Sequence, residues 1–380
     1  MPIINQVVQG SGGGSGPRYY IDKSVDANGK MVEGNTIIDT TGVTEIGENI
    51  LASAYSGNTN ISGAVNFSSI TKLNRRSLSA CFSGTHITSF NMSGLTTLYG
   101  LGCLVDCCSN CTDLVSADLQ SVTVVEQEGF RRTFSGCTNF TTYNLDSVTS
   151  AATSSFNETF KGTKITSLSL PNITTVSGSY CFQSVCESCV YLTSVNLPKL
   201  KIANQSYAFV SAFKGCSLLP TAGFPSLSEI KQQRVFSGAF VNCVALQSLW
   251  FYALTPSSFG TQDNQFETML NGCSNVTVHF PMAIQSTIGS WSSVTGGFNG
   301  TNTTVLFDIV TSLTGADGNT YTRSEKDSTS TATAWVYNDT LYYTSGVSNN
   351  TAGVNEPSVA DTIYSDDACT QSVTTITAIA

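Results

Sequence analysis

A four-residue pattern recurs along the middle of the chain at a nearly constant interval. Phe134-Ser-Gly-Cys137 and Phe213-Lys-Gly-Cys216 are two clear copies, and every copy ends on a cysteine or another small residue. The nine end positions are 58, 85, 111, 137, 163, 189, 216, 243 and 273, so successive copies lie 26 to 30 residues apart. A period in the twenties held over many copies is typical of a solenoid. Since no single unit can bury its apolar face alone, the sequence predicts a stack of about nine units.

A short strand is predicted directly after each copy of the pattern. In Ile165-Thr-Ser-Leu-Ser-Leu170 and Leu246-Gln-Ser-Leu-Trp-Phe251, apolar residues recur as L-x-x-L-x-L, the pattern of a leucine-rich repeat. Apolar and polar residues alternate, which indicates one buried face and one wet face. The segment 205–213 then returns along the other side of the unit, and we expect it to be irregular or a short helical or 3₁₀ turn. The predicted fold is therefore a leucine-rich-repeat solenoid of the α/β class.

The two half-patterns together resemble the BspA-like leucine-rich repeat family. Leu168-Ser-Leu-Pro-Asn-Ile173 and Val195-Asn-Leu-Pro-Lys-Leu200 match the strand half, and the F-x-G-C copies match the return half. The resemblance covers roughly residues 36–281. It departs at both ends, where the first unit is degenerate and the unit from about 246 is longer, as expected for capping units.

Four regions are expected from the change of character along the chain. Residues 1–35 contain a glycine-rich tract and an Asn28-Gly29 turn, which is typical of a tether with a hairpin. Residues 36–281 form the solenoid and residues 282–310 cap its end. Residues 311–380 are predicted to be a small all-β module, because short apolar runs alternate with turn residues. The start of the chain is similar to N-termini of bacteriophage virion proteins, and this resemblance implies virion docking through Ile3, Ile4, Val7 and Val8.

Cysteine is unusually frequent and follows the repeat. Of thirteen cysteines, six end a copy of the pattern, and stacking would align them in one column: Cys111, Cys137, Cys189, Cys216, Cys243 and Cys273. Thr85, Thr163 and Asn58 occupy the same place, so we interpret the position as a buried small residue. Coil-to-coil disulfides are one alternative, and a zinc site is the other, in one of two groups of nearby cysteines: Cys103, Cys107, Cys108 and Cys111, or Cys181, Cys186 and Cys189.

The charge balance excludes some partner classes. Only 11% of the residues are charged and the net charge is −9, without a cluster of Lys and Arg. Nucleic acid and anionic membrane surfaces are therefore not expected as partners. No run of apolar residues is long enough to insert into a membrane, and we expect no secretory signal at the start.

No catalytic site or cofactor is expected, and no metal. The chain has two histidines without ligand spacing, and Glu126 and Glu128 lie in one return segment without a partner motif, so we interpret them as solvated. The candidate binding residues are polar residues on the wet face: Asn91, Asp118, Asn144 and Asn196. They are suited either to hydrogen-bond sugars or to stack as an asparagine ladder. Trp250 breaks this series and Tyr252 follows it, so the two rings are expected either to bind a sugar or protein, or to pack under the terminal cap.

These features favour a non-enzymatic head or tail fibre or decoration protein of a bacteriophage, located on the virion. It would contact other virion proteins through its N-terminus and a host surface glycan or protein through the solenoid or the C-terminal module, and a homo-oligomer is left open. The alternative is a bacterial or protist cell-surface adhesin, which the BspA-like resemblance also implies. A glycan-cleaving tailspike enzyme is a third class, and it would need paired carboxylates on one face.

Overall fold

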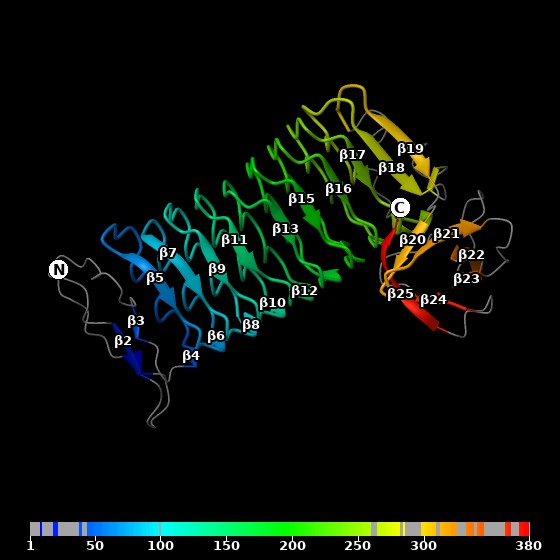
Figure 1. Cartoon of the computed structure of the whole chain (residues 1–380). Coiled ribbons are helices and arrows are strands. Elements are labelled where there is room, and N and C mark those ends of the chain that lie inside the picture. The colour runs from blue at the N-terminus through cyan, green and yellow to red at the C-terminus, as the bar shows by residue number, and fades with distance from the viewer. Residues whose placement is uncertain are drawn as a thin grey trace.

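The middle of the chain is a stack of coils that form a parallel β-solenoid of about nine turns, shown in Figure 1 from blue to yellow. The computed structural model describes residues 8–9, 18–21, 38–39, 44–98, 100–259, 264–281, 284–285, 298–308, 312–324, 332–337, 340–345, 362–365 and 372–379. The predicted solenoid is confirmed.

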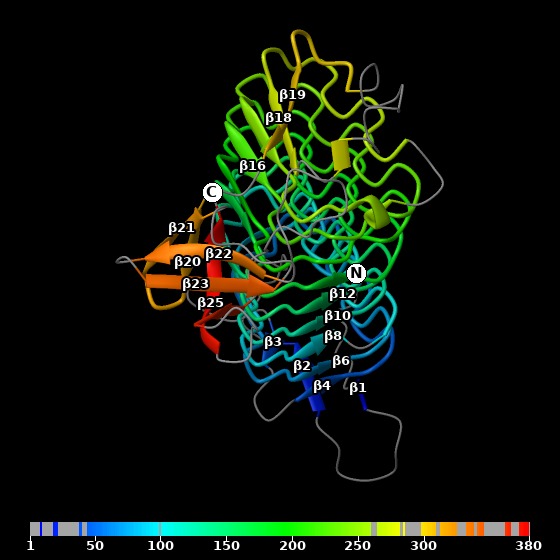
Figure 2. The ribbon, with the colours of Figure 1, turned by 90° about the vertical axis from the view of Figure 1, so that its right-hand side faces the viewer.

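Each coil between β5 and β14 contributes two short strands, because the apolar residues of the repeat point inward from two sides. One side forms a continuous parallel sheet of two-residue strands, which Figure 2 shows in part: β4 (Glu45–Ile46), β6 (Lys72–Leu73), β8 (Thr97–Leu98), β10 (Val124–Val125), β12 (Ser150–Ala151) and β14 (Thr175–Val176).

The other side carries the L-x-x-L-x-L segments and is divided into three parallel sheets. The first contains β5 (Ser62–Asn66), β7 (His86–Asn91), β9 (Ser116–Asp118) and β11 (Thr142–Asn144), and the second contains β13 (Ser167–Ser169) and β15 (Ser194–Asn196). The third contains β16 (Thr221–Gly223), β17 (Ser248–Trp250), β18 (Thr277–Pro281) and β19 (Thr304–Asp308).

A tyrosine hydroxyl lies between the first two of these sheets. The hydroxyl of Tyr143 donates to the carbonyl of Ser167 and accepts from the N–H of Ser169, both at 2.9 Å. The ring stacks on Phe160 at a centroid distance of 4.6 Å. The phenol thus takes the place of a backbone ladder between β11 and β13 and satisfies two strand groups that would otherwise lack partners.

The return segments are not helical, so the expected helical returns are wrong for the described coils. Alternate N–H groups bond within and between coils: Ala52 donates to the Asn49 carbonyl three residues back at 3.3 Å, whereas Leu51 donates to Ser77 of the next coil at 2.9 Å. Every fourth residue has a positive φ, as at Asn49 (57°) and Ser53 (56°). Each coil therefore returns as a series of tight turns that is cross-linked to its neighbours as a sheet is, whereas a helix would need successive i to i−4 bonds.

The interior contains aromatic ladders that run along the solenoid axis. In the longest ladder the rings of successive coils lie 4.9 to 5.8 Å apart, and its members are Phe130, Phe156, Phe182, Phe209, Phe236 and Phe266. All six are buried. A repeat of about 26 residues places identical side chains one above another at the ~4.8 Å spacing of strands, which is close to a stacking distance for rings.

The two ends of the solenoid carry further strands. Near the N-terminus, β1 (Val8–Gln9), β2 (Arg18–Ile21) and β3 (Ile38–Asp39) form a small antiparallel sheet. At the other end Ile284 and Phe298 are buried in the solenoid core, and β19 extends the last sheet.

Beyond β19, six antiparallel strands close into a barrel: β20 (Ser312–Gly315), β21 (Thr320–Ser324), β22 (Ala332–Tyr337), β23 (Thr340–Ser345), β24 (Thr362–Tyr364) and β25 (Ser372–Ile379). Figure 1 shows it in orange and red at the C-terminal end of the solenoid. That this region is an independent module stays a prediction.

Candidate binding surface on the solenoid sheet

The outward positions of the long strands align in columns along the solenoid. Asn91 is in register with Asp118, and Asp118 with Asn144. Ser169 is in register with Asn196 on the second sheet. The polar residues selected from the sequence therefore lie on one face, divided by the break at Tyr143.

Most of these polar side chains serve local turns. The side-chain oxygens of Asn91, Asp118 and Asn144 each accept the backbone N–H two residues further on, at 2.9, 3.3 and 3.2 Å. Asn196 differs, because its amide donates to the Ser169 hydroxyl at 3.1 Å. These residues are therefore not held in place by an asparagine ladder along the face. They form Asx turns at the ends of the strands, which is the local bonding that Asn and Asp favour.

The character of the face changes on the third sheet. Gly223, Trp250, His279 and Leu306 are aligned across β16, β17, β18 and β19, and we call this set the aromatic row. The Trp250 and His279 rings stack at 5.7 Å with an interplanar angle of 23°. Both side chains are partly exposed, and Leu306 is 42% exposed. The row thus places two stacked, partly exposed rings on paired strands.

The neighbouring Tyr252 has a different place. It packs against the apolar cluster of the barrel, which contains Tyr321, Ile363 and Ile376. The two rings considered together in the sequence are thereby separated: Trp250 lies in the aromatic row, and Tyr252 lies where the solenoid contacts the barrel.

Sequence reasoning did not select His279 as a binding residue. The steps along this column are 27 residues from Gly223 to Trp250 and 29 residues from Trp250 to His279, because the intervening coil is longer. A fixed period of 26 or 27 residues therefore misses His279. The signal that could have found it is the strand Thr277-Val-His-Phe280, which has the same alternation as Ser248-Leu-Trp-Phe251.

The six residues of the cysteine column are buried and aligned. Each thiol donates to a backbone carbonyl of the preceding coil, with S···O distances of 2.9 to 3.1 Å. Thr85 and Thr163, at the same position, donate to Phe82 and Phe160 of their own coil at 2.7 Å. Burial raises the pKa of Cys111 to about 11, so its thiol stays protonated and can donate.

The alternatives considered for cysteine are not seen in the described part of the chain. No disulfide joins the twelve cysteines described there, all of which are buried. Among the same residues, no three His, Cys, Asp or Glu side chains gather in a way that could hold a metal ion.

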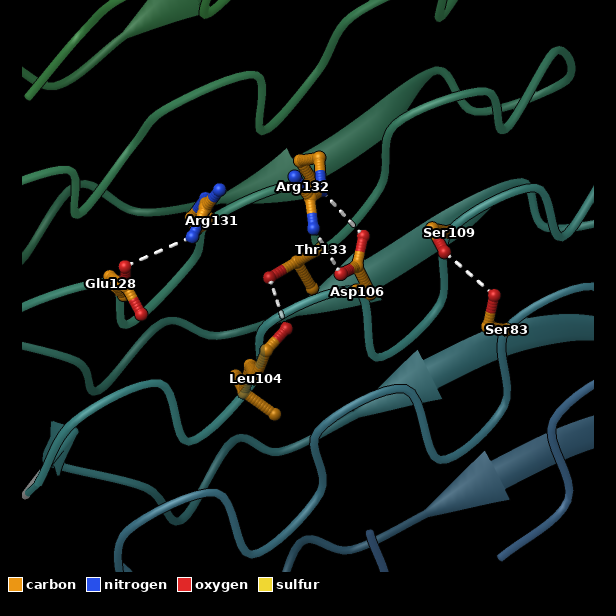
Figure 3. A network of polar contacts seen from close by, with 8 residues as sticks. All are labelled: Ser83, Leu104, Asp106, Ser109, Glu128, Arg131, Arg132 and Thr133. Atoms are coloured by element: carbon orange, nitrogen blue, oxygen red, sulfur yellow. Dashed lines mark hydrogen bonds and ion pairs between the residues drawn. The ribbon is translucent and has the colours of Figure 1, made fainter. Parts of the chain in front are cut away.

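Carboxylates on the return face pair with arginines. Arg132 makes two bonds to Asp106 of the preceding coil, at 2.8 and 2.6 Å, and Arg131 bonds to Glu128 at 3.0 Å (Figure 3). The same region includes the hydroxyl pair Ser83 and Ser109, 2.8 Å apart. Glu128, one of the two carboxylates considered for acid–base work, is therefore engaged in an ion pair within its own coil, whereas the Arg132–Asp106 and Ser83–Ser109 contacts join neighbouring coils.

The structure addresses two further expectations only in part. Of the virion-docking residues, Ile3, Ile4 and Val7 lie outside the described residues, and Val8 is described only as part of β1, paired with Tyr19 of β2. None of the described helical residues forms a helix of the length and apolarity that crossing a membrane requires.

Comparison with known proteins adds no family assignment. No protein-family model matches the chain, and no curated protein matches its sequence.

Proposed function

We propose that the chain is a non-enzymatic binding protein that recognises a surface glycan through the aromatic row, and that it is a fibre or decoration protein of a bacteriophage particle. The observation that supports the glycan-binding part of this proposal is the stack of Trp250 on His279 at the outward face of β17 and β18. A sugar presents a face of C–H groups that packs well on an indole, and aromatic rings supply contact area at low entropic cost.

The scaffold suits this role because it fixes the rings before a ligand arrives. Trp250 and His279 belong to paired parallel strands whose inward neighbours, Phe251 and Phe280, are stacked in the core at 5.4 Å. Binding therefore costs little ordering of the protein. A single aromatic row supports modest affinity, and several copies on one particle would raise it through multivalency.

The virion assignment rests on the N-terminal resemblance and on the extended shape of a stacked solenoid. In this proposal residues 1–35 dock the chain to other virion proteins through Ile3, Ile4, Val7 and Val8. In this proposal the barrel, whose apolar cluster packs against Tyr252, is an all-β module. The BspA-like resemblance keeps a cell-surface adhesin as the second candidate, with the same binding surface.

Glycan-array and calorimetric binding measurements on the full chain test whether the aromatic row recognises a glycan. Trp250→Ala should abolish binding and His279→Ala should weaken it, because each removes ring surface from the row. His86→Ala is the matched control: His86 lies on β7, on the first sheet, and should bind as the wild type does. Equal binding by all three variants would refute recognition by this row.

Immunogold labelling separates the two locations. An antibody against the solenoid should label purified particles if the chain is a virion protein. Label on host cells with bare particles would replace the virion assignment with the adhesin.

A further inference from the structure

We propose that the ligand of the aromatic row is an uncharged, extended oligosaccharide that crosses β15, β16 and β17 and reaches an apolar ridge at the corner of the solenoid. This inference rests on the proposed function and adds the chemical class of the ligand and its path. The ridge is defined by Val190, Tyr191, Leu218 and Val244.

The ridge is the main concentration of exposed apolar side chains among the described residues. Val190 and Tyr191 are 43% and 47% exposed, Leu218 is 52% exposed and Val244 is 64% exposed. They come from three consecutive coils, just before β15, β16 and β17. Since single exposed apolar residues are common but clusters are not, a set repeated on three neighbouring coils indicates an interaction surface.

The ridge residues lie in the turns that lead into β15, β16 and β17, and the last two of these strands carry Gly223 and Trp250 of the aromatic row. Val244 and Trp250 are six residues apart on the same segment, so they are separated by at most about 20 Å of extended chain. Between them lie outward hydroxyl residues, of which Thr221 and Ser248 are in register and Ser194 occupies the matching position on β15. Hydroxyls both donate and accept, as sugar hydroxyls require.

The absence of charged residues from these segments favours an uncharged ligand. The chain has no charged residue in 188–198, 215–228 or 242–259, the three segments that build the face. The corresponding region of the first sheet carries Asp113, Asp118 and Asp146. A face without cations offers no partner for the carboxylates or sulfates of an acidic glycan, and the net charge of −9 repels them. A neutral chain of sugars fits the face in charge, in hydroxyl groups and in length.

Calorimetry with two oligosaccharide series on the full chain tests the inference. One series is neutral, made of glucose, mannose, galactose or N-acetylglucosamine units in increasing length, and the other is a matched series of uronic-acid oligosaccharides. We expect affinity for a neutral series to rise with length until the chain spans both the row and the ridge. Tyr191→Ala and Leu218→Ser should each weaken binding of the longer chains by about tenfold and leave the shortest binder unchanged.

The control variant is Val115→Ser. Val115 is 47% exposed, as Tyr191 is, but it precedes β9 on the first sheet and lies away from the proposed path. It should bind every oligosaccharide as the wild type does. Circular dichroism of all variants verifies that they fold.

Three results would overturn the inference. Affinity that does not depend on length, with ridge variants equal to wild type, would leave the aromatic row as a short-glycan site and remove the ridge. Tighter binding of uronic-acid chains would remove the neutral ligand class. If Trp250→Ala and the wild type bind none of the oligosaccharides, both the inference and the proposed glycan recognition fail.

Discussion

Replacing Gln265 by leucine should stabilise the protein. The side chain of Gln265 is fully buried, and among the described residues neither its amide nitrogen nor its amide oxygen has a hydrogen-bond partner. The equivalent positions of the preceding coils are Val235, Ala208 and Cys181, all buried and small or apolar. Gln265 therefore places a polar amide where the three preceding coils hold side chains that need no partner.

The magnitude follows from the two unsatisfied groups. Each buried donor or acceptor without a partner costs about 1–3 kcal/mol. Leucine is close to glutamine in size, removes both groups and buries additional apolar surface, while its branching introduces some strain. We expect a net gain of about 2–4 kcal/mol for Gln265→Leu.

Equilibrium denaturation in urea and amide exchange measure this effect. The amide to follow is that of Phe236, which donates to the Gln265 carbonyl at 2.7 Å and should exchange more slowly in the variant. Gln247→Leu, at an exposed position, is the control and should change stability by no more than about 0.5 kcal/mol. A loss of stability in Gln265→Leu would show that the amide is satisfied after all, for instance by a buried water, and would refute the reasoning.

Three other variants or conditions probe the core and the sheet. Phe209→Ala removes a ring from the middle of the longest aromatic ladder and should cost about 3–5 kcal/mol in urea denaturation; a loss under 1 kcal/mol would contradict a packed ladder. Tyr143→Phe should cost about 1–3 kcal/mol and speed the amide exchange of Ser169, because the strand groups lose their bridging hydroxyl; unchanged exchange would refute the bridge. Burial raises the pKa of Cys103 to about 12, so the folded state favours the neutral thiol. The contribution of the neutral thiol to the free energy of unfolding is complete below the unfolded pKa of about 8.5 and should be lost between about pH 8.5 and 12. The urea midpoint should therefore fall over this range, and it should fall less in a Cys103→Ala variant.

The sequence is most informative where one residue type is required at a fixed interval. The cysteine column and the inward apolar positions could be placed in register from spacing alone, because a misplaced residue there would leave a cavity or bury a polar group. Within each of the three sheets, the outward residues as far as Trp250 are also in register. It failed at His279, because a coil of different length shifts the count without changing the strand pattern.

Contacts between distant parts of the chain could not be predicted from the period of the repeat. Tyr252 packs against the apolar cluster of the barrel, which is far away in the sequence and outside the repeat, so no period relates Tyr252 to the residues of that cluster. The Tyr143 hydroxyl between two sheets was equally invisible, since a tyrosine at an inward strand position gives no sign of where its hydroxyl lies.

The return segments were missed for a reason that leads to a further test. The last positive-φ position of most returns is the glycine of the repeated pattern, but the earlier ones are occupied by residues as different as Asn49, Ser53 and Tyr180 and carry no common side-chain signature. The conformation is imposed by hydrogen bonds to the next coil and not by local preference. A non-glycine residue in this region costs about 1–2 kcal/mol, so many returns hold backbone strain that the stacked coils offset.

The strain should appear as opposite effects of one substitution at two nearby sites. Ser53 is exposed with φ 56°, and Ser56, also exposed, is not among the positive-φ residues. Ser53→Gly relieves the left-handed strain but increases the entropy of the unfolded chain, for a net gain of about 0.5–1 kcal/mol. Ser56→Gly incurs only the entropic cost and should lose about 0.5–1 kcal/mol. Urea denaturation of the two variants decides the matter: if both lose stability equally, Ser53 is not strained, and the coil-to-coil bond of its N–H to Ser79 at 2.8 Å does not hold it against its local preference.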